Sequence, residues 1–210
     1  MRNLILIGGR GSGKTTLATA LRAELPDFCY VYTSVYTVRV PLTLIKSTDP
    51  KVARPNLLEL SRKEYVRTVM ANANVPELPF SREELDQYAF RLVDRYGEAV
   101  ISDIVLAVAQ PGRQYLFDNV ARAANIRYLK DKGFFVVGLH ASHETRIRRR
   151  HLEGRDIDPK DRSDLERQIE MSDEFFQITD CLPLADRRYN TDEISANSPK
   201  IVREIVEAIR

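Results

Sequence analysis

The sequence has only two cysteines and no long apolar run, and these shortages exclude several classes of protein. Cys29 and Cys181 are far apart and match neither the spacing of a metal site nor a disulfide framework. Such sparse cysteine favours a reducing compartment, so we expect a cytoplasmic protein. No apolar stretch is long enough to span a membrane, and residues 1–7 are too short for a signal peptide. We therefore expect no membrane partner.

Charge of one sign is also lacking, because 32 Lys and Arg nearly balance 30 Asp and Glu and leave a formal charge of +2. No global field therefore indicates nucleic acid as a partner. The three histidines have no ligand spacing with other donors, which makes a histidine metal site improbable. With 43% hydrophobic residues in 210, the chain can bury one sizeable core. Nothing in the sequence indicates an oligomeric state.

A glycine-rich motif follows the first apolar run. Residues 8–15 read GGRGSGKT and match the pattern G-x-x-x-x-G-K-[ST]. Residues 3–7 before it are typical of a buried strand, and leucines at four-residue steps after it are typical of a helix. A glycine turn that merely starts a helix is the alternative, but the strand and helix on either side favour a phosphate-binding loop.

This loop predicts the cofactors and their ligands. Its glycines allow backbone N–H groups to approach phosphate oxygens closely at a helix N-terminus, so we expect ATP or a related triphosphate to bind there. Lys14 would supply charge to the β- and γ-phosphates, and the Thr15 hydroxyl would bind Mg²⁺. The predicted nucleotide contacts are Gly8, Gly9, Gly11, Ser12, Gly13, Lys14, Thr15 and Thr16.

A second acid is expected beside the loop. Residues 114–119, QYLFDN, are typical of an apolar strand that ends in Asp118, which could bind Mg²⁺ or act as a base. The alternative is that Asp118 caps the next helix. Arg122 lies four residues later, and if a helix begins near Asn119 its side chain could reach a substrate phosphate. A solvated arginine on a helix face is equally compatible with this position.

The most basic stretch is a candidate lid. It contains Arg146, Arg148, Arg149, Arg150, Arg155 and Arg162. Arginines of a closing lid can stabilise charge on a transferred phosphoryl group, and we favour Arg155 and Arg150 for this role. Most of the run should be solvated surface, because consecutive positions on a helix cannot all face one ligand. A nucleic-acid patch is possible but lacks interleaved aromatic residues.

Alternating strand and helix patterns predict an α/β fold with a parallel sheet. The expected strands span residues 3–7, 29–40, 114–117, 134–139 and 187–189. The expected helices span residues 15–25, 59–73, 81–96, 99–109, 121–132, 142–153, 161–174 and 201–209. Residues 37–112 are therefore expected to be a mostly helical substrate-binding insertion, and residues 150–165 a short lid, within one domain of residues 1–210.

Four segments together resemble the nucleoside monophosphate kinase superfamily, and within it dephospho-CoA kinase and its archaeal-type relatives. They are GGRGSGKT, FDNVAR, HASHETRIRRRHLEGRDIDPKDR and LADRRYNTDE. The resemblance implies a P-loop fold with five strands in the order 2-3-1-4-5. It also implies that Arg122 holds an acceptor phosphate, that Arg155 and less surely Arg162 belong to the lid, and that Asn190, with Ala185 and Asp186 nearby, contacts the base.

The segment TSVYTVR departs from this superfamily. Tyr36 stands where related kinases have an acid, although Arg39 matches their arginine. We hypothesise an ATP-dependent phosphotransferase that acts on a nucleotide or nucleotide-like acceptor, such as a nucleoside monophosphate or dephospho-CoA. The alternatives are a nucleotide-dependent switch or ATPase that acts through a protein partner, and a nucleic-acid end kinase. The sequence names neither the acceptor nor the choice between ATP and GTP.

Overall fold

A parallel sheet positions the glycine-rich loop. In the computed structural model, which describes residues 1–53, 56–153 and 162–210, five strands lie in the order β2-β3-β1-β4-β5. The strands are β1 (Leu4–Ile7), β2 (Phe28–Tyr32), β3 (Gln114–Asp118), β4 (Phe135–His140) and β5 (Arg187–Asn190). β1 pairs in parallel with β3 and β4, and β4 pairs in parallel with β5. The predicted strand order is therefore confirmed.

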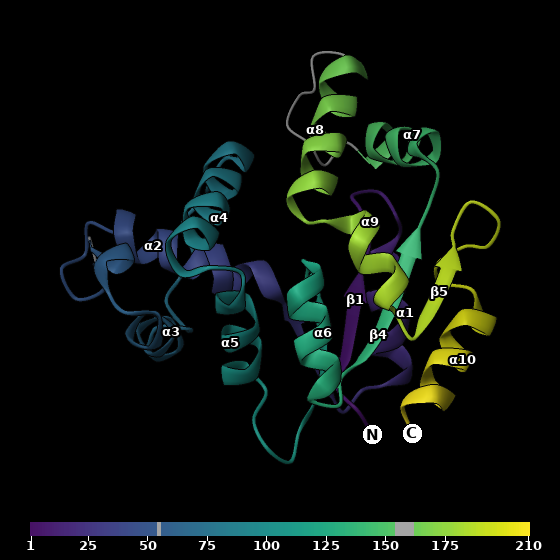
Figure 1. The fold of residues 1–210 in the computed structure, drawn as a ribbon, viewed down its shortest axis with the longest axis horizontal. Helices are drawn as coiled ribbons and strands as arrows, with labels where there is room; N and C mark the ends of the chain where they lie inside the picture. Colours follow the sequence, from purple (N-terminus) through teal and green to yellow (C-terminus); the bar gives the residue numbers. More distant parts are fainter. Residues whose placement is uncertain (54–55, 154–161) are drawn as a thin grey trace. The chain divides into compact units, whose positions relative to one another are not determined.

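Helices connect the strands along the chain, and several of them lie in the long connection between β2 and β3 (Figure 1). They are α1 (Lys14–Glu24), α2 (Val40–Lys46), α3 (Arg62–Ala71), α4 (Arg82–Tyr96), α5 (Ala99–Val108), α6 (Ala123–Asp131), α7 (His143–Glu153), α8 (Arg162–Phe175), α9 (Ile178–Cys181) and α10 (Pro199–Ile209). The sequence analysis did not anticipate α9 or the 3-10 turn η3 (Leu182–Leu184) after it. Among these described helices, none has the length and apolar character needed to cross a membrane.

Contacts divide the chain into two compact units. Met1–Val31 and Gln114–Arg210 form the first, and Tyr32–Arg113 form the second. The first unit contains β1, β3, β4 and β5, together with the glycine-rich loop between β1 and α1. The second contains helices α2 to α5. That the second unit binds a substrate stays a prediction.

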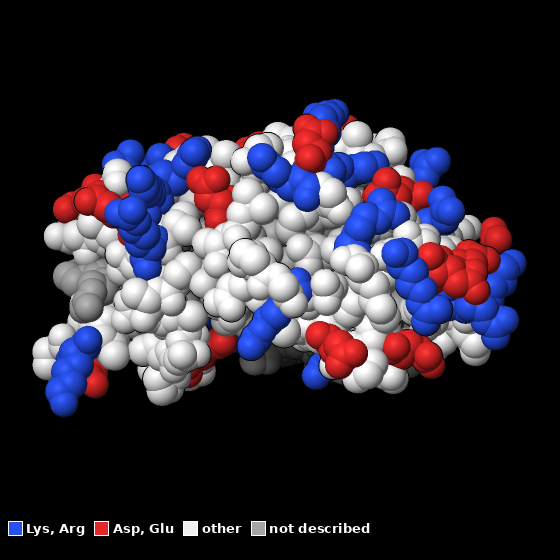
Figure 2. Space-filling model, turned by 90° about the horizontal axis from the view of Figure 1, so that it is seen from below, with Lys and Arg blue, Asp and Glu red and all other residues white. Residues whose placement is uncertain are grey.

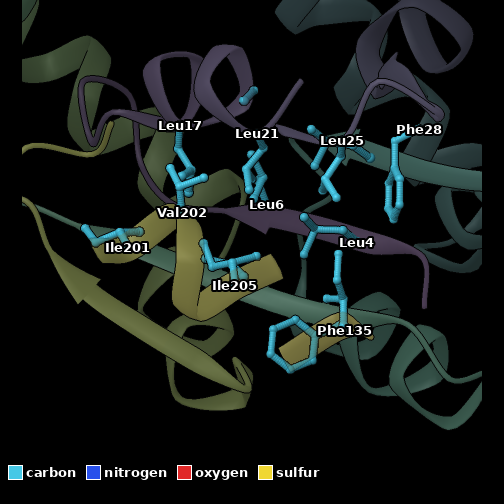
Figure 3. Close-up of a cluster of buried hydrophobic side chains, with 14 of the residues drawn as sticks. Leu4, Leu6, Leu17, Leu21, Leu25, Phe28, Phe135, Ile201, Val202 and Ile205 are labelled. Atoms are coloured by element: carbon cyan, nitrogen blue, oxygen red, sulfur yellow. The ribbon is translucent and has the colours of Figure 1, made fainter. Parts of the chain in front are cut away.

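One face of the sheet packs on α1 and α10 through a shared apolar core. Leu4 and Leu6 of β1 point to this face because alternate residues of a strand share a side. Leu17 and Leu21 of α1 meet them, and Figure 3 shows α10 contributing Ile205 to the same cluster. On the opposite face, α6 and α9 lie in front of β1 and β4 in Figure 1. The glycine-rich loop thus runs from a strand of the sheet, β1, to a helix packed on that sheet, α1.

The second strand ends earlier than the sequence predicted. We expected a strand over residues 29–40, but β2 ends at Tyr32 and a helical segment follows, with the π turn η1 (Val35–Arg39) leading into α2. Pro41 explains the π turn, because proline has no N–H and its ring clashes with the carbonyl four residues earlier. The backbone N–H of Val40 instead bonds to the carbonyl of Val35, five residues back.

The capping box predicted before α4 is present. The hydroxyl of Ser81 accepts a hydrogen bond from the backbone N–H of Glu84, and the carboxylate of Glu84 accepts one from the backbone N–H of Ser81. Ser61 and Glu64 form the same arrangement before α3. Local sequence therefore sets where α3 and α4 begin.

Shortening a side chain of α10 in the shared core should destabilise the protein. Ile205 is fully buried, so Ile205→Ala should lower the free energy of unfolding by about 3 kcal/mol through lost burial and a cavity. Ile194 keeps 39% of its surface exposed, so Ile194→Ala should cost less than about 1 kcal/mol. Urea unfolding followed by circular dichroism measures both. Equal losses in the two variants would contradict this account of the core.

Candidate functional site

The glycine-rich loop is closely packed where it leaves β1. A Cβ atom at Gly8 would lie 2.3 Å from the carbonyl oxygen of Leu139 on β4 and 2.7 Å from the hydroxyl of Ser12. Gly8 also has a φ of 151°, and Gly13, which caps α1, has a φ of 94°. Side chains rarely adopt these values, so the loop path requires glycine at both positions.

Side chains hold the carbonyl groups of five successive loop residues. Lys14 Nζ donates to the carbonyls of Gly8 and Gly9 at 2.6 and 2.9 Å. Each of the other three donors bonds to one carbonyl. Arg146 Nε donates to the carbonyl of Arg10 at 2.7 Å, and Arg149 Nη1 donates to that of Gly11 at 3.2 Å. The Thr191 hydroxyl donates to the carbonyl of Ser12 at 3.0 Å. They come from α1, from α7 and from the residue after β5, so the loop depends on three separate segments.

The donors from α7 and Thr191 hold the carbonyls of residues 10–12 and turn the backbone N–H groups that follow away from those elements. In a trans peptide the C=O and the next N–H point in opposite directions, so a carbonyl held outside the loop directs the following N–H to the other side. The N–H of Ser12 is an exception because it bonds to the carbonyl of Gly9. The first turn of α1 has no acidic residue to offset the helix dipole. The loop therefore has the donors and the local field that an anion needs.

The register of the sheet places Asp118 beside the loop. Leu6 of β1 is paired with Asp118 of β3, and the N–H of Asn119 bonds to the carbonyl of Leu6. Burial raises the pKa of Asp118, while the charge of Lys14 and a hydrogen bond from Tyr30 act in the opposite direction. Burial also lowers the pKa of Lys14 to about 8, against the attraction of Asp118. The two predicted residues therefore influence each other's ionisation.

Tyr30 fixes one oxygen of Asp118. The Tyr30 hydroxyl donates to Asp118 Oδ2 at 2.9 Å. The other oxygen, Oδ1, is buried and has no hydrogen-bond partner among the described residues. A buried carboxylate oxygen without a donor is costly and rare, and one explanation is an ion that binds there. Sequence reasoning did not predict this contact, because Tyr30 on β2 lies next to β3 only in the folded sheet.

Thr15 and Thr16 lie at the exposed start of α1. Their position matches the prediction that they contact nucleotide, and contact itself stays a prediction. Within the described parts of the chain, no group of three or more His, Cys, Asp and Glu side chains is placed to hold a metal ion. Mg²⁺ commonly binds through one or two protein groups and substrate phosphates, so Thr15 and Asp118 remain suitable ligands for it.

A small pocket opens beside the loop. It has a volume of about 100 Å³ and is lined by Gly11, Gly13, Thr16, Arg149, Ser195 and Ala196. Arg149 also bonds to the hydroxyl and the carbonyl of Thr191, at 2.9 and 2.6 Å, which joins α7 to the segment after β5. Sequence reasoning did not identify Ser195 or Ala196, because no motif marks the turn that precedes α10.

Arg122 does not lie on a helix as the sequence analysis supposed. Asn119 and Arg122 have φ values of 69° and 73°, so α6 begins only at Ala123. The guanidinium of Arg122 lies 4.9 Å from the centre of the Phe175 ring, and the backbone N–H of Arg122 donates to the carbonyl of Phe176. Positive φ values in residues other than glycine are strained and often mark functional sites. That Arg122 binds an acceptor phosphate stays a prediction.

Two arginines of α7 contact the loop. The sequence analysis favoured Arg150 and Arg155; Arg150 is half-buried on α7, and Arg155 lies outside the described residues. The loop contacts shown by the structure come from Arg146 and Arg149. Their three-residue spacing places them on one helix face, and the preceding strand β4 is adjacent to β1. Arg146 and Arg150, four residues apart, share a helix face as well, so spacing alone does not single out Arg149.

The residues expected near the base lie at opposite ends of β5. Asn190 ends the strand next to His140, at the edge that carries the loop, and its side chain bonds to Glu193 and to the N–H of Asp192. Asp186 precedes β5 and forms an ion pair with Lys130 at 3.0 Å. Asp186 is thus engaged at the far end of the sheet, while a base contact by Asn190 stays a prediction.

Comparisons with known proteins establish the fold. The sequence matches no family model and no curated protein. The structure resembles a shikimate kinase from Bacteroides thetaiotaomicron, with a TM-score of 0.55, 14% identity, and 99% of this chain and 96% of that chain covered. It also resembles a gluconokinase from Sinorhizobium meliloti 1021, with a TM-score of 0.51, 12% identity, and 99% and 95% covered. The chain therefore has the α/β P-loop fold of these kinases, as predicted.

Lys14 should make stability depend on pH in the alkaline range. Its pKa of about 8 lies below the ordinary value of 10.5, so between these values the unfolded chain binds more protons than the folded chain. Stability of the wild type relative to Lys14→Met should therefore rise from about pH 8 to about pH 10.5, by at most about 3 kcal/mol. Urea unfolding of both proteins at four pH values tests this, and a constant difference would contradict the lowered pKa.

Proposed function

We propose that this protein is an ATP-dependent phosphotransferase that uses Mg²⁺ and acts on a small, nucleotide-like acceptor. The observation that carries the proposal is the loop of residues 8–15, whose carbonyls are held outward beside Lys14 and a buried acid, Asp118. This combination provides fixed N–H donors, a mobile positive charge and a carboxylate at one edge of the sheet. Phosphoryl transfer requires positioning and charge neutralisation of this kind.

The residues fit a triphosphate and a magnesium ion. A Cβ atom at Gly11 would lie 2.8 Å from the carbonyl oxygen of Arg146, so a residue with a side chain could not lie this close to α7. Lys14 would neutralise phosphate charge, and Thr15 with Asp118 would hold Mg²⁺, which when bound offsets the charge that develops on the phosphates. The buried, unpartnered Oδ1 of Asp118 is consistent with a cation ligand.

The acceptor is proposed from two sources. The sequence resemblance favours a nucleoside monophosphate or dephospho-CoA, with Arg122 at an acceptor phosphate and Arg155 on a lid. Two proteins with this fold are a shikimate kinase and a gluconokinase, which supports a small-molecule kinase and adds shikimate and gluconate to the candidate acceptors. Tyr36 lies in the π turn η1, where related kinases carry an acid, so Asp118 is the candidate for assisting the acceptor.

Removing the charge of Lys14 should abolish transfer. Lys14→Ala should lower kcat/KM for ATP by at least about a hundredfold, because Lys14 is the predicted source of positive charge at the β- and γ-phosphates. The exposed Lys132 provides a matched control, and Lys132→Ala should retain activity. The assay incubates Mg·ATP with nucleoside monophosphates, dephospho-CoA, shikimate, gluconate and 5′-hydroxyl oligonucleotides and detects products by mass spectrometry. Robust transfer by Lys14→Ala would refute the assignment.

The same assay separates the two alternative functions. Slow ATP hydrolysis that no acceptor changes would favour a switch or ATPase that acts through a protein partner. Phosphorylated oligonucleotide would favour an end kinase, but Arg146 and Arg149 are engaged by the loop and so offer little to a polynucleotide. On the face shown in Figure 2, Lys and Arg side chains lie among Asp and Glu side chains, which also does not favour a nucleic-acid surface.

A further inference from the structure

Each nitrogen of the Arg146 guanidinium donates a hydrogen bond beside the glycine-rich loop. Arg146 is 8% exposed. Its guanidinium forms a bidentate ion pair with Asp173 of α8, with Nη1 2.6 Å from Oδ2 and Nη2 2.8 Å from Oδ1. Its Nε donates to the carbonyl of Arg10 at 2.7 Å. Bidentate pairs of this kind are strong and geometrically specific, because the planar guanidinium can bond to both carboxylate oxygens at once. Asp173 therefore fixes the orientation of the group that holds the loop.

The loop is shaped to receive this pair. A Cβ atom at Gly9 would lie 2.5 Å from Arg146 Nη2 and 2.7 Å from Asp173 Oδ1. At Gly11 it would lie 2.8 Å from the carbonyl oxygen of Arg146. The phosphate-loop pattern demands glycine only at its first and sixth positions, which here are Gly8 and Gly13. The two additional glycines are explained by the close approach of α7.

The pair also links the loop to the contact between α7 and α8. Ile147 of α7 packs with Leu165 and Ile169 of α8 in a separate apolar cluster. Arg146 precedes Ile147, and Asp173 lies one helical turn beyond Ile169. The cluster and the ion pair therefore hold the same two helices together, and only the ion pair reaches the loop.

We propose that Arg146 and Asp173 are a positioning pair that holds the carbonyl of Arg10 outward and so keeps the loop able to bind a polyphosphate. Neither residue needs to touch the ligand. The proposal rests on the proposed function only in that the loop binds a triphosphate. It implies that phosphate affinity depends on a contact between α7 and α8.

Binding measurements test the pair without relying on catalysis. Isothermal titration with ATP, and with inorganic tripolyphosphate as a base-free probe, is performed on the full chain well below its melting temperature. Arg146→Ala should weaken binding of both ligands by about tenfold or more, because the carbonyl of Arg10 loses its donor. Asp173→Asn should weaken both by less, because an amide can still accept one hydrogen bond.

A second Arg–Asp pair on α8 provides matched controls. Arg167 and Asp164 are joined at 3.5 Å and are largely exposed, so Arg167→Ala and Asp164→Asn should leave both affinities within about twofold of wild type. A residue with a merely structural role would lower the melting temperature without changing affinity in the folded protein. Folded Arg146→Ala with wild-type affinity would therefore overturn the proposal.

Gly9 supplies a variant whose effect depends on Arg146. Its φ lies outside the positive range, so alanine is compatible with the backbone there, and the methyl group would meet only the Arg146–Asp173 pair among its nearest neighbours. Gly9→Ala should weaken tripolyphosphate binding in the wild type and add no further loss in Arg146→Ala. Independent, additive losses would overturn the proposal.

Failure of this inference is distinguishable from failure of the proposed function. A wild-type protein that binds neither ATP nor tripolyphosphate refutes nucleotide binding, and with it both proposals. If the wild type binds ATP, Lys14→Ala does not, and Arg146→Ala binds as the wild type does, nucleotide binding stands and the positioning pair is refuted.

Discussion

The structure around the loop depends on hydrogen bonds to its peptide carbonyls. Five successive carbonyls, those of residues 8–12, each accept a bond from a side chain: two from Lys14 at the end of the motif and three from other segments. Buried carbonyls need partners, and their orientation sets that of the neighbouring N–H groups. The donors come from α1, α7 and the end of β5, so the anion-binding geometry belongs to the sheet and its helices as much as to the loop.

The parallel sheet brings these donors together. β1, β4 and β5 are consecutive neighbours, so the segments that follow them reach one edge, where the loop, Arg146 and Thr191 meet. On the other side of β1, β3 delivers Asp118 opposite Leu6. Burial then moves the pKa of Asp118 up and that of Lys14 down, while their opposite charges attract. Fold and electrostatics thus act on the same two residues.

Sequence reasoning succeeded where the signal was local. The capping box of Ser81 and Glu84, the strand that ends at Asp118 and the helix after Gly13 follow from residues only a few positions apart. It failed where a local preference was overridden: the Tyr- and Val-rich segment after Tyr32 has strand propensity but forms a helix with a π turn. Packing within the second unit buries Val38, Val40 and Leu44 from that helix, which a strand pattern does not reveal.

The sequence by itself determined the loop, the lysine and the positions of most strands along the chain, because glycine spacing and apolar periodicity act over short distances. The order of the strands in the sheet was predicted from the resemblance to a kinase superfamily and not from local patterns. Only the tertiary structure decided which arginines support the loop. No sequence signal distinguishes the four arginines of α7, Arg146, Arg148, Arg149 and Arg150. In the packed structure Arg146 and Arg149 donate to carbonyls of the loop, whereas Arg148 is exposed. Tyr30 and Asp173 likewise acquire their partners through contacts 88 and 27 residues apart. Such pairings depend on how whole elements pack, and no local pattern encodes them.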